Sequence, residues 1–229
     1  MPTRLYLAST SPARRSLLAQ SGIEPVLVAP GVDEEAAAAA EATRLGRPLT
    51  GPELVALLAV AKARAVAGPA DAPSSVAGER IDGVVFGGDS AFEVDGTLYG
   101  KPHDPAVARA RWRQMLAAGG GTLWSGHAVI DRRAGTTRPV PDTVVAVDSA
   151  VLEFASDMTT DEVDAYVATG EPLEVAGAFT IDGRAAAYIT RIDGSPSAVV
   201  GLSLPMLRTM LLEGFGISWH DLWSGPGVL

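Results

Sequence analysis

The chain has 229 residues, 47% of them hydrophobic and 20% charged, which is the composition of a folded globular protein and not of a disordered one. Its net charge of −9 excludes bulk electrostatic binding to nucleic acid or to an anionic membrane surface. The absence of cysteine excludes disulfides, thiolate metal sites and a cysteine nucleophile. Without a signal-peptide pattern or a long apolar segment, the protein is expected to be soluble and cytoplasmic.

The chain opens with an expected strand over residues 4–8 and a helix over 13–21, joined by a turn rich in Ser and ending in Pro12. Such a turn leaves backbone N–H groups free at the start of a helix, and Arg14 adds a guanidinium. These features fit an anion site. They also fit a Ser N-cap followed by exposed arginines, which the sequence alone slightly favours.

A second expected strand, over residues 24–29, leads to an acidic run that includes Glu34. Carboxylates just after a strand form either a metal or water site or a solvated loop. The Ala-rich stretch 36–51 is interpreted as a loop or loose helix. A helix over 52–67 has its apolar residues at helical spacing, with Lys62 beside that face. Residues 68–78 are interpreted as a flexible connector.

The stretch Val84–Asp104 combines a buried-type strand, a Gly-Gly pair and Asp89. We place Asp89 at the carboxyl end of that strand, where ligands bind in open α/β sheets. A hairpin is expected to follow, around Asp95-Gly96. A three-residue loop would set Asp89 opposite Lys101, whereas a two-residue turn would set Ser90 there. The acid and the lysine are either a hydrolytic pair or a surface ion pair.

The rest of the chain continues the alternation of strands and helices. Its expected elements are a helix over 104–118, strands over 123–130 and 143–154, a helix over 159–168 with Thr160 as N-cap, a hairpin over 181–193 around Asp182-Gly183, a loop over 194–200 and a helix over 204–213. This order predicts an α/β fold with a mixed sheet. No P-loop, Rossmann glycine pattern, zinc-type His pair or GxSxG elbow is present.

Six segments occur in the order of the motifs of one family: LASTSPARRSLLAQSGI, GVDEE, LAVAKARAV, GGDSAFEVDGTLYGKPHD, TGEPLEVAGAF and IDGSPSAVVGLSLP. The chain thereby resembles the Maf family of nucleoside triphosphate pyrophosphatases from Leu5 to about Leu212. The resemblance implies a single domain over 1–229 with a mixed, twisted central sheet flanked by helices and two lobes around a cleft, similar to the inosine triphosphatases. Stretches 36–50 and 69–80 look like insertions.

The resemblance also implies a reaction, hydrolysis between the α- and β-phosphates that releases a nucleoside monophosphate and pyrophosphate. Its catalytic acceptor would be Asp89, and Glu34 and Asp89 would hold a divalent cation such as Mg²⁺, Mn²⁺ or Co²⁺. The other expected substrate-binding residues are Ser9, Arg14, Lys62 and Lys101. No nucleic acid or membrane partner is expected, and a homodimer is possible. The alternative is a nucleotide-binding regulator of cell division with weak or no catalysis.

Three positions that resemble the family's specificity positions depart from both known patterns. Members that prefer dTTP and UTP have Arg, Thr and Gln where this chain has Ala13, Ser90 and Asp182, and they have Lys in place of Val175. Members that prefer 7-methyl-GTP have Trp, Gln and Glu at the first three positions, and Asp182 is chemically nearer to that Glu. The base preference therefore stays open.

Overall fold

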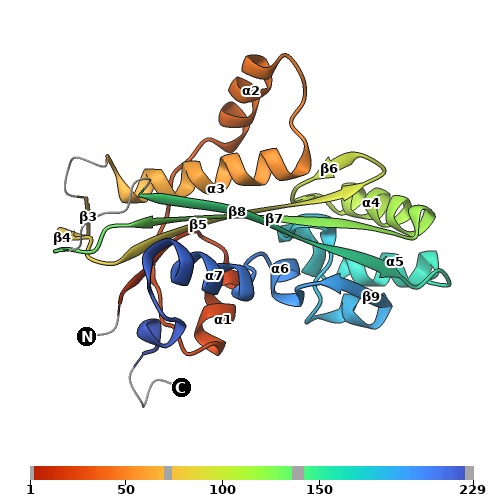
Figure 1. The fold of residues 1–229 in the computed structure, drawn as a ribbon. Coiled ribbons are helices and arrows are strands. Elements are labelled where there is room, and N and C mark those ends of the chain that lie inside the picture. The colour runs from red at the N-terminus through yellow and green to blue at the C-terminus, as the bar shows by residue number, and fades with distance from the viewer. Residues whose placement is uncertain (1–2, 70–73, 136–141, 225–229) are drawn as a thin grey trace. The chain divides into compact units, whose positions relative to one another are not determined.

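The computed structural model describes residues 3–69, 74–135 and 142–224 (Figure 1). Its α-helices are α1 (Pro12–Gln20), α2 (Glu34–Leu45), α3 (Gly51–Ala67), α4 (Pro105–Ala118), α5 (Thr160–Ala168), α6 (Pro196–Val200) and α7 (Leu204–Phe215). Short 3-10 helices are η1 (Glu171–Glu174), η2 (Ala176–Ala178), η3 (Arg184–Tyr188) and η4 (Trp219–Leu222). The strands are β1 (Leu5–Ala8), β2 (Val26–Val28), β3 (Ser75–Val76), β4 (Glu79–Arg80), β5 (Val84–Val94), β6 (Thr97–Tyr99), β7 (Gly120–Asp131), β8 (Thr143–Phe154) and β9 (Ile189–Gly194).

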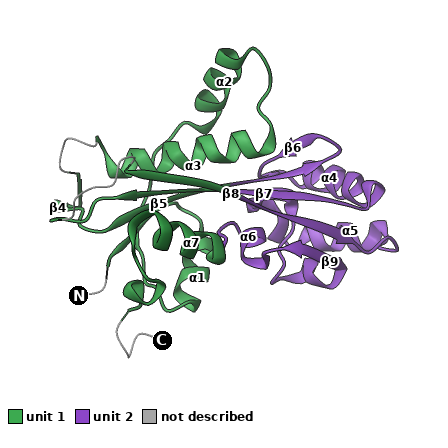
Figure 2. Ribbon diagram, in the orientation of Figure 1, with its two compact units in different colours: residues 1–89, 126–147, 204–229 green, residues 90–125, 148–203 purple. Residues whose placement is uncertain are grey.

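Seven strands form one mixed sheet in the order β2-β1-β5-β7-β8-β9, with β6 paired to β5. Strand β1 is parallel to β2 and β5, whereas β6 and β9 are antiparallel to β5 and β8. A central mixed sheet flanked by helices confirms the predicted fold class. The chain forms two compact units, one of residues 1–89, 126–147 and 204–229, the other of residues 90–125 and 148–203 (Figure 2).

In the first unit, helix α3 covers one face of the sheet and helices α1 and α7 cover the other (Figure 1). Two glycines let α3 approach the strands closely. A Cβ on Gly87 would lie 2.3 Å from the carbonyl oxygen of Ala59, and one on Gly126 would lie 2.1 Å from that of Val55. Both distances are below any real Cβ contact, so only glycine fits. This packing fixes the height of α3 above β5.

The core of the second unit is aromatic. Its buried rings meet edge to face, with centroids 5.0–6.4 Å apart, which is the favoured geometry for aromatic pairs. The rings are those of Phe92, Trp112, Phe154, Tyr166 and Phe179. The indole N–H of Trp112 donates to the carbonyl oxygen of Ala178 at 2.8 Å, which satisfies the one polar group of that ring.

Strand β5 corrects the expected position of Asp89. The strand does not end at the Gly-Gly pair but continues to Val94, so Asp89 lies in its middle. Gly87 serves the close approach of α3, and Gly88 leaves room for the side chains of Phe86 and Arg14, so neither glycine marks a turn. The hairpin forms with the two-residue turn, since Val94 pairs with Thr97. Asp95 and Gly96 both have positive φ, 47° and 75°, as a type I′ turn requires.

Of residues 36–51, interpreted as a loop or loose helix, those up to Leu45 belong to the ordered helix α2, which begins at Glu34. The Asp33 side chain accepts from the backbone N–H of Ala36 at 2.9 Å, and Glu34 and Glu35 lie in the first turn. Gly46 ends the helix in the left-handed conformation. Alanine has the highest helix propensity, so two good caps suffice to form this helix although none of its residues is buried.

Three smaller expectations are also wrong. Residues 181–193 form a turn, η3 and strand β9, not a hairpin, because Glu171 binds both ends of the turn, as described below. The expected loop 194–200 contains helix α6, started by Pro196. The N-cap of α5 is Thr159, which forms a capping box with Glu162. Of the connector at 68–78, residues 70–73 lie outside the described residues, and β3 pairs with β4 beyond them.

Candidate active site

The predicted catalytic and substrate-binding residues other than Lys101 lie in the first unit. Ser9 follows β1, Arg14 lies on α1, Glu34 begins α2, Lys62 lies on α3 and Asp89 lies on β5. The pairing of β1 with β5, in which Ala8 is opposite Gly87, puts the end of β1 beside the Gly88-Asp89 part of β5.

Lys62 lies between two carboxylates. Its Nζ is 2.7 Å from Oδ1 of Asp89 and 2.8 Å from Oε1 of Glu34. The side chains of Lys62 and Asp89 are 9% and 11% exposed, whereas that of Glu34 is 49% exposed. A buried ammonium with two carboxylate partners is satisfied electrostatically. Because Glu34 is half exposed, this group of charges is accessible from solvent on the side of α2.

Arg14 brings a second buried cation to the site. Its Nη1 donates to Oγ of Ser9 at 3.2 Å, and Ser9 also accepts from the backbone N–H of Ser11 at 3.1 Å. The Oγ of Ser11 accepts from the N–H of Arg14 at 3.4 Å and so caps α1. A Cβ on Gly88 would lie 3.3 Å from Nε of Arg14, so the guanidinium runs along the β5 backbone next to Asp89.

Burial shifts the pKa values of two of these groups. It raises the pKa of the Asp89 carboxyl above its ordinary value, and the attraction of Lys62 only partly offsets the shift. It lowers the pKa of the Arg14 guanidinium, which Asp89 and Glu34 partly offset. Perturbed groups of this kind cluster at functional sites.

The carboxylates of Glu34 and Asp89 suit a divalent cation. They already share one cationic group, the ammonium of Lys62, at 2.7–2.8 Å, so their oxygens converge on one point. Two carboxylates with the remaining positions left to water and phosphate are a typical ligand set for Mg²⁺. Among residues 3–69, 74–135 and 142–224, no group of three or more acids or histidines forms a metal site.

Lys101 lies in the second unit, with a different partner. Its Nζ is 3.7 Å from Oε2 of Glu174, and Nδ1 of His103 is 3.1 Å from Oε1 of the same residue. All three side chains are more than half exposed. Buried Arg111 donates to the carbonyl oxygen of Gly100, the residue before Lys101. That Lys101 acts together with Asp89 stays a prediction.

The three expected specificity positions have different surroundings. Ala13 is partly buried on α1. Ser90 Oγ lies 3.2 Å from Oγ of Ser125. Ser125 donates its single proton to the carbonyl oxygen of Ala198 at 2.7 Å, so the Ser90 hydroxyl is the donor in the pair. Asp182 is exposed in a turn.

Glu171 holds the turn that contains Asp182 from both sides. Its carboxylate accepts from the hydroxyl of Thr180 at 2.7 Å and from the backbone N–H of Arg184 at 2.9 Å, so it binds the residues that flank Ile181, Asp182 and Gly183. A Cβ on Gly183 would lie 2.4 Å from Oε1 of Glu171. Sequence reasoning missed this role, although a Gly-Glu-Pro sequence before a turn was visible.

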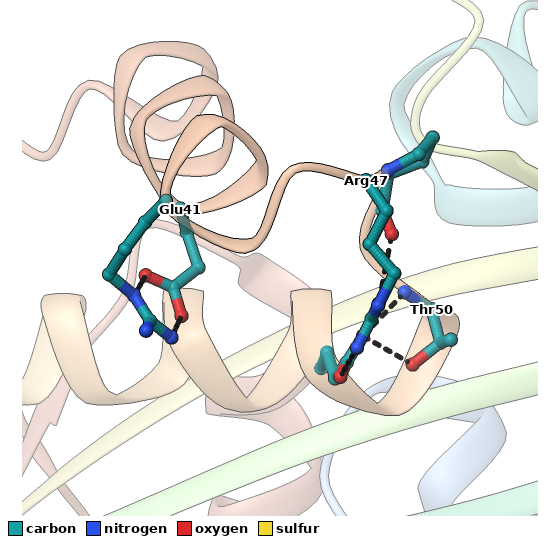
Figure 3. Close-up of polar contacts among 6 residues, drawn as sticks. Glu41, Arg47 and Thr50 are labelled. Atoms are coloured by element: carbon teal, nitrogen blue, oxygen red, sulfur yellow. Dashed lines mark hydrogen bonds and ion pairs between the residues drawn. The ribbon is translucent and has the colours of Figure 1, made fainter.

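The loop between α2 and α3 is fixed by a bidentate ion pair. Arg47 binds Glu53 through both terminal nitrogens, at 2.7 and 2.8 Å, and Glu53 also accepts from the N–H and hydroxyl of Thr50 (Figure 3). Glu41 binds Arg44 within α2 in the same bidentate manner. These contacts hold the end of the helix that begins with Glu34.

No α-helix among the described residues has the length and apolar character needed to cross a bilayer.

Comparisons with known proteins give the family. A family model described as Maf-like protein matches residues 4–214. The chain is 52% identical over 225 residues to a protein of Leifsonia xyli subsp. xyli, covering 98% of this chain and 99% of that protein. It is 44% identical over 226 residues to one of Nocardia farcinica, covering 99% of each, and 46% identical over 227 residues to one of Saccharopolyspora erythraea, covering 97% of this chain and 98% of the relative. All three relatives are named nucleoside triphosphate pyrophosphatase, and the chain belongs to the Maf family.

Proposed function

We propose that the protein hydrolyses nucleoside triphosphates between the α- and β-phosphates, releasing a nucleoside monophosphate and pyrophosphate. The observation that carries the proposal is the group of two buried cations and two carboxylates at Lys62, Arg14, Asp89 and Glu34. The relatives named nucleoside triphosphate pyrophosphatase share 41–52% identity with this chain over nearly its full length, which supports the same assignment.

The chemistry follows from the charges. A water oxygen forms a bond to the α-phosphorus. The bond from the α-phosphorus to the oxygen that bridges it to the β-phosphorus breaks, and pyrophosphate leaves with that oxygen. Asp89, buried and next to a solvent-accessible carboxylate, is suited to orient that water and accept its proton. Arg14 offers a fixed fork of donors for phosphate oxygens, and Lys62 offers a mobile point charge. Lys101 is proposed as a further phosphate ligand.

The balance of charges argues for a divalent cation. Arg14 and Lys62 carry two positive charges, and Glu34 and Asp89 carry two negative ones, so the group is neutral when both acids are ionised. A neutral site does not attract a triphosphate. A divalent cation bound by Glu34 and Asp89 would supply the missing positive charge and stabilise the charge that develops on the leaving pyrophosphate. Mg²⁺, Mn²⁺ and Co²⁺ are the candidates.

The test is a panel of natural and modified nucleoside triphosphates with Mg²⁺, Mn²⁺ or Co²⁺, in which pyrophosphate and orthophosphate are measured separately. Pyrophosphate with an equal amount of nucleoside monophosphate is expected. Binding of nucleotides without turnover of any of them would favour a regulator, and release of orthophosphate alone would indicate a different hydrolase. The panel also gives the base preference, for which we propose Ala13, Ser90 and Asp182 as determinants.

Two further expectations concern the setting of the reaction. We expect the enzyme to act in the cytoplasm, where nucleoside triphosphates are available, and expect neither nucleic acid nor a membrane as partner because the chain is acidic, with a net charge of −9. Light scattering combined with size exclusion measures whether the chain forms a homodimer.

A further inference from the structure

The chain has only two lysines, Lys62 and Lys101, among its 18 basic residues. Elsewhere its positive charges are on arginine. At position 62 the ammonium is nine-tenths buried and touches both carboxylates that suit a divalent cation, at 2.7 and 2.8 Å. We propose that Lys62 competes with the divalent cation for Glu34 and Asp89, so that binding of the cation displaces the ammonium. This inference rests on the proposed function.

The displacement follows from geometry. A Mg²⁺ ion binds carboxylate oxygens at about 2.1 Å, and the ammonium lies 2.7–2.8 Å from one oxygen of each carboxylate. Two cations on the same oxygens would thus be no more than about 5 Å apart. Because the side chains of Lys62 and Asp89 are only 9% and 11% exposed, repulsion at that separation is weakly screened. The two carboxylates therefore hold one cation or the other in that position.

The side chains differ in their freedom to move. Helix α3 is fixed by the close approach of Gly87 and Gly126, so Lys62 cannot leave by a shift of its backbone. Its four-carbon stem can instead swing the ammonium to another position, which a planar and stacked guanidinium does less readily. The displaced ammonium becomes available to oxygens of the triphosphate. Lys62 would then hold the carboxylates together before the cation binds and bind phosphate afterwards.

The first test measures binding of Mn²⁺ by electron paramagnetic resonance in the absence of nucleotide. Lys62→Met should bind Mn²⁺ about tenfold more tightly than the wild-type protein, since its carboxylates have no competing ammonium. The matched control is Arg64→Met, which removes one exposed positive charge from the same helix and should change the affinity by less than about twofold. Equal affinity of Lys62→Met and the wild-type protein would overturn the proposal.

A second test uses the unaltered protein, so it does not depend on the folding of a variant. Labelling with lysine carrying ¹³C at Cε and ¹⁵N at Nζ should give two side-chain signals, one for each lysine. On addition of Mg²⁺ without nucleotide, the Lys62 signal should shift in parallel with occupancy of the site, and the Lys101 signal should stay in place. If Mg²⁺ displaces bound Mn²⁺ completely, and so fills the same site, while the Lys62 signal does not move, the displacement is contradicted.

The outcomes separate this inference from the proposed function. If the wild-type protein releases pyrophosphate but Lys62→Met binds Mn²⁺ no more tightly, the competition is wrong and the function stands. If no triphosphate is hydrolysed but the variant binds Mn²⁺ more tightly and the Lys62 signal shifts, the competition stands and the function is wrong. Circular dichroism shows whether Lys62→Met is folded. If it is not, Lys62→Gln, which also removes the ammonium, replaces it in the Mn²⁺ binding test with the same expected result.

Discussion

Gly87 lies against Ala59 so closely that a Cβ on the glycine would be 2.3 Å from the carbonyl oxygen of Ala59 and 2.6 Å from the amide nitrogen of Ala63. Both neighbours are backbone atoms of α3, which cannot move out of the way as a side chain can. The contact lies two residues before Asp89 on β5 and one residue from Lys62 on α3. It therefore sets the separation between α3 and β5, the elements that carry the ion pair of Lys62 and Asp89.

Gly87→Ala is expected to destabilise the protein and to weaken catalysis together. Overpacking a rigid contact costs about 1–3 kcal/mol, and the shift of α3 moves Lys62 away from Asp89. Thermal unfolding and pyrophosphate release measure the two effects. The control for stability is Gly100→Ala, because a Cβ at Gly100 meets nothing within 4 Å. An unchanged Tm for Gly87→Ala would show that α3 can adjust at no cost.

The sequence predicted this region only in part. Hydrophobic periodicity and Gly-Pro signals located β1, α1, α3 and α4 within one or two residues, because each of them is determined by its own pattern. The same local signal failed at Gly87-Gly88, where Gly87 contacts a helix that begins 36 positions earlier in the chain. No local pattern encodes such a contact.

The candidate site shows the same limit. The turn before the first helix indicates an anion site at Arg14, but the roles of Arg14 and Lys62 toward a triphosphate come from the resemblance to a family. The location of Lys62 between Glu34 and Asp89 joins α2, α3 and β5 and could not be derived from residue order. Ser125, which orients Ser90, lies 35 positions away from it, so a list of motifs does not reveal the pair.

Asp89→Asn is expected to lower pyrophosphate release by about 10³-fold, within the range that removal of a general base gives. The amide keeps the size of the carboxyl but can neither accept a proton from water nor carry negative charge beside Lys62. The control is Asp95→Asn, in the turn that follows on the same strand, where Asn tolerates the positive φ of 47°. It should retain full activity. Full activity of a folded Asp89→Asn protein would remove Asp89 from the mechanism.

Glu53→Gln is expected to lower the Tm in a pH-dependent manner. Hydrogen bonds from Arg47 and then from Thr50 hold the pKa of Glu53 well below its ordinary value of 4.5. A depressed pKa means that the unfolded chain binds the proton first as pH falls. The stabilisation is therefore present above 4.5 and is lost as pH falls through the lower, folded-state pKa.

The measurement is the Tm of Glu53→Gln and wild-type protein from neutral to acid pH. Because the ion pair is exposed, we expect a decrease of only about 1–3 °C at pH 7, and this difference should narrow below pH 4.5. Glu213→Gln is the matched control, since Glu213 is exposed and makes no ion pair among residues 3–69, 74–135 and 142–224. A difference that widens in acid would contradict the assignment.

Arg111→Met is expected to weaken substrate binding with little loss of stability. Arg111 is 5% exposed, its guanidinium lies 4.7 Å from the ring centroid of Tyr99, and its Nε has no hydrogen-bond partner among the described residues. Burial lowers the pKa of this guanidinium. Methionine removes the cost of burying this charge together with its contacts to Tyr99 and Gly100, and because the two effects oppose each other, the Tm should change by no more than about 3 °C.

The effect on binding comes through the backbone. Arg111 donates to the carbonyl oxygen of Gly100, the residue before Lys101. Without the guanidinium this carbonyl loses its hydrogen bond, and the backbone that carries Lys101 is held less firmly. If Lys101 binds phosphate, KM should rise about three- to tenfold while kcat stays within about twofold, the pattern of lost ground-state binding. Arg113→Met, which removes an exposed arginine from the same helix, should leave KM unchanged. A fall in kcat at constant KM would instead assign Arg111 to the chemical step, and an unchanged KM would show that Gly100 is held without it.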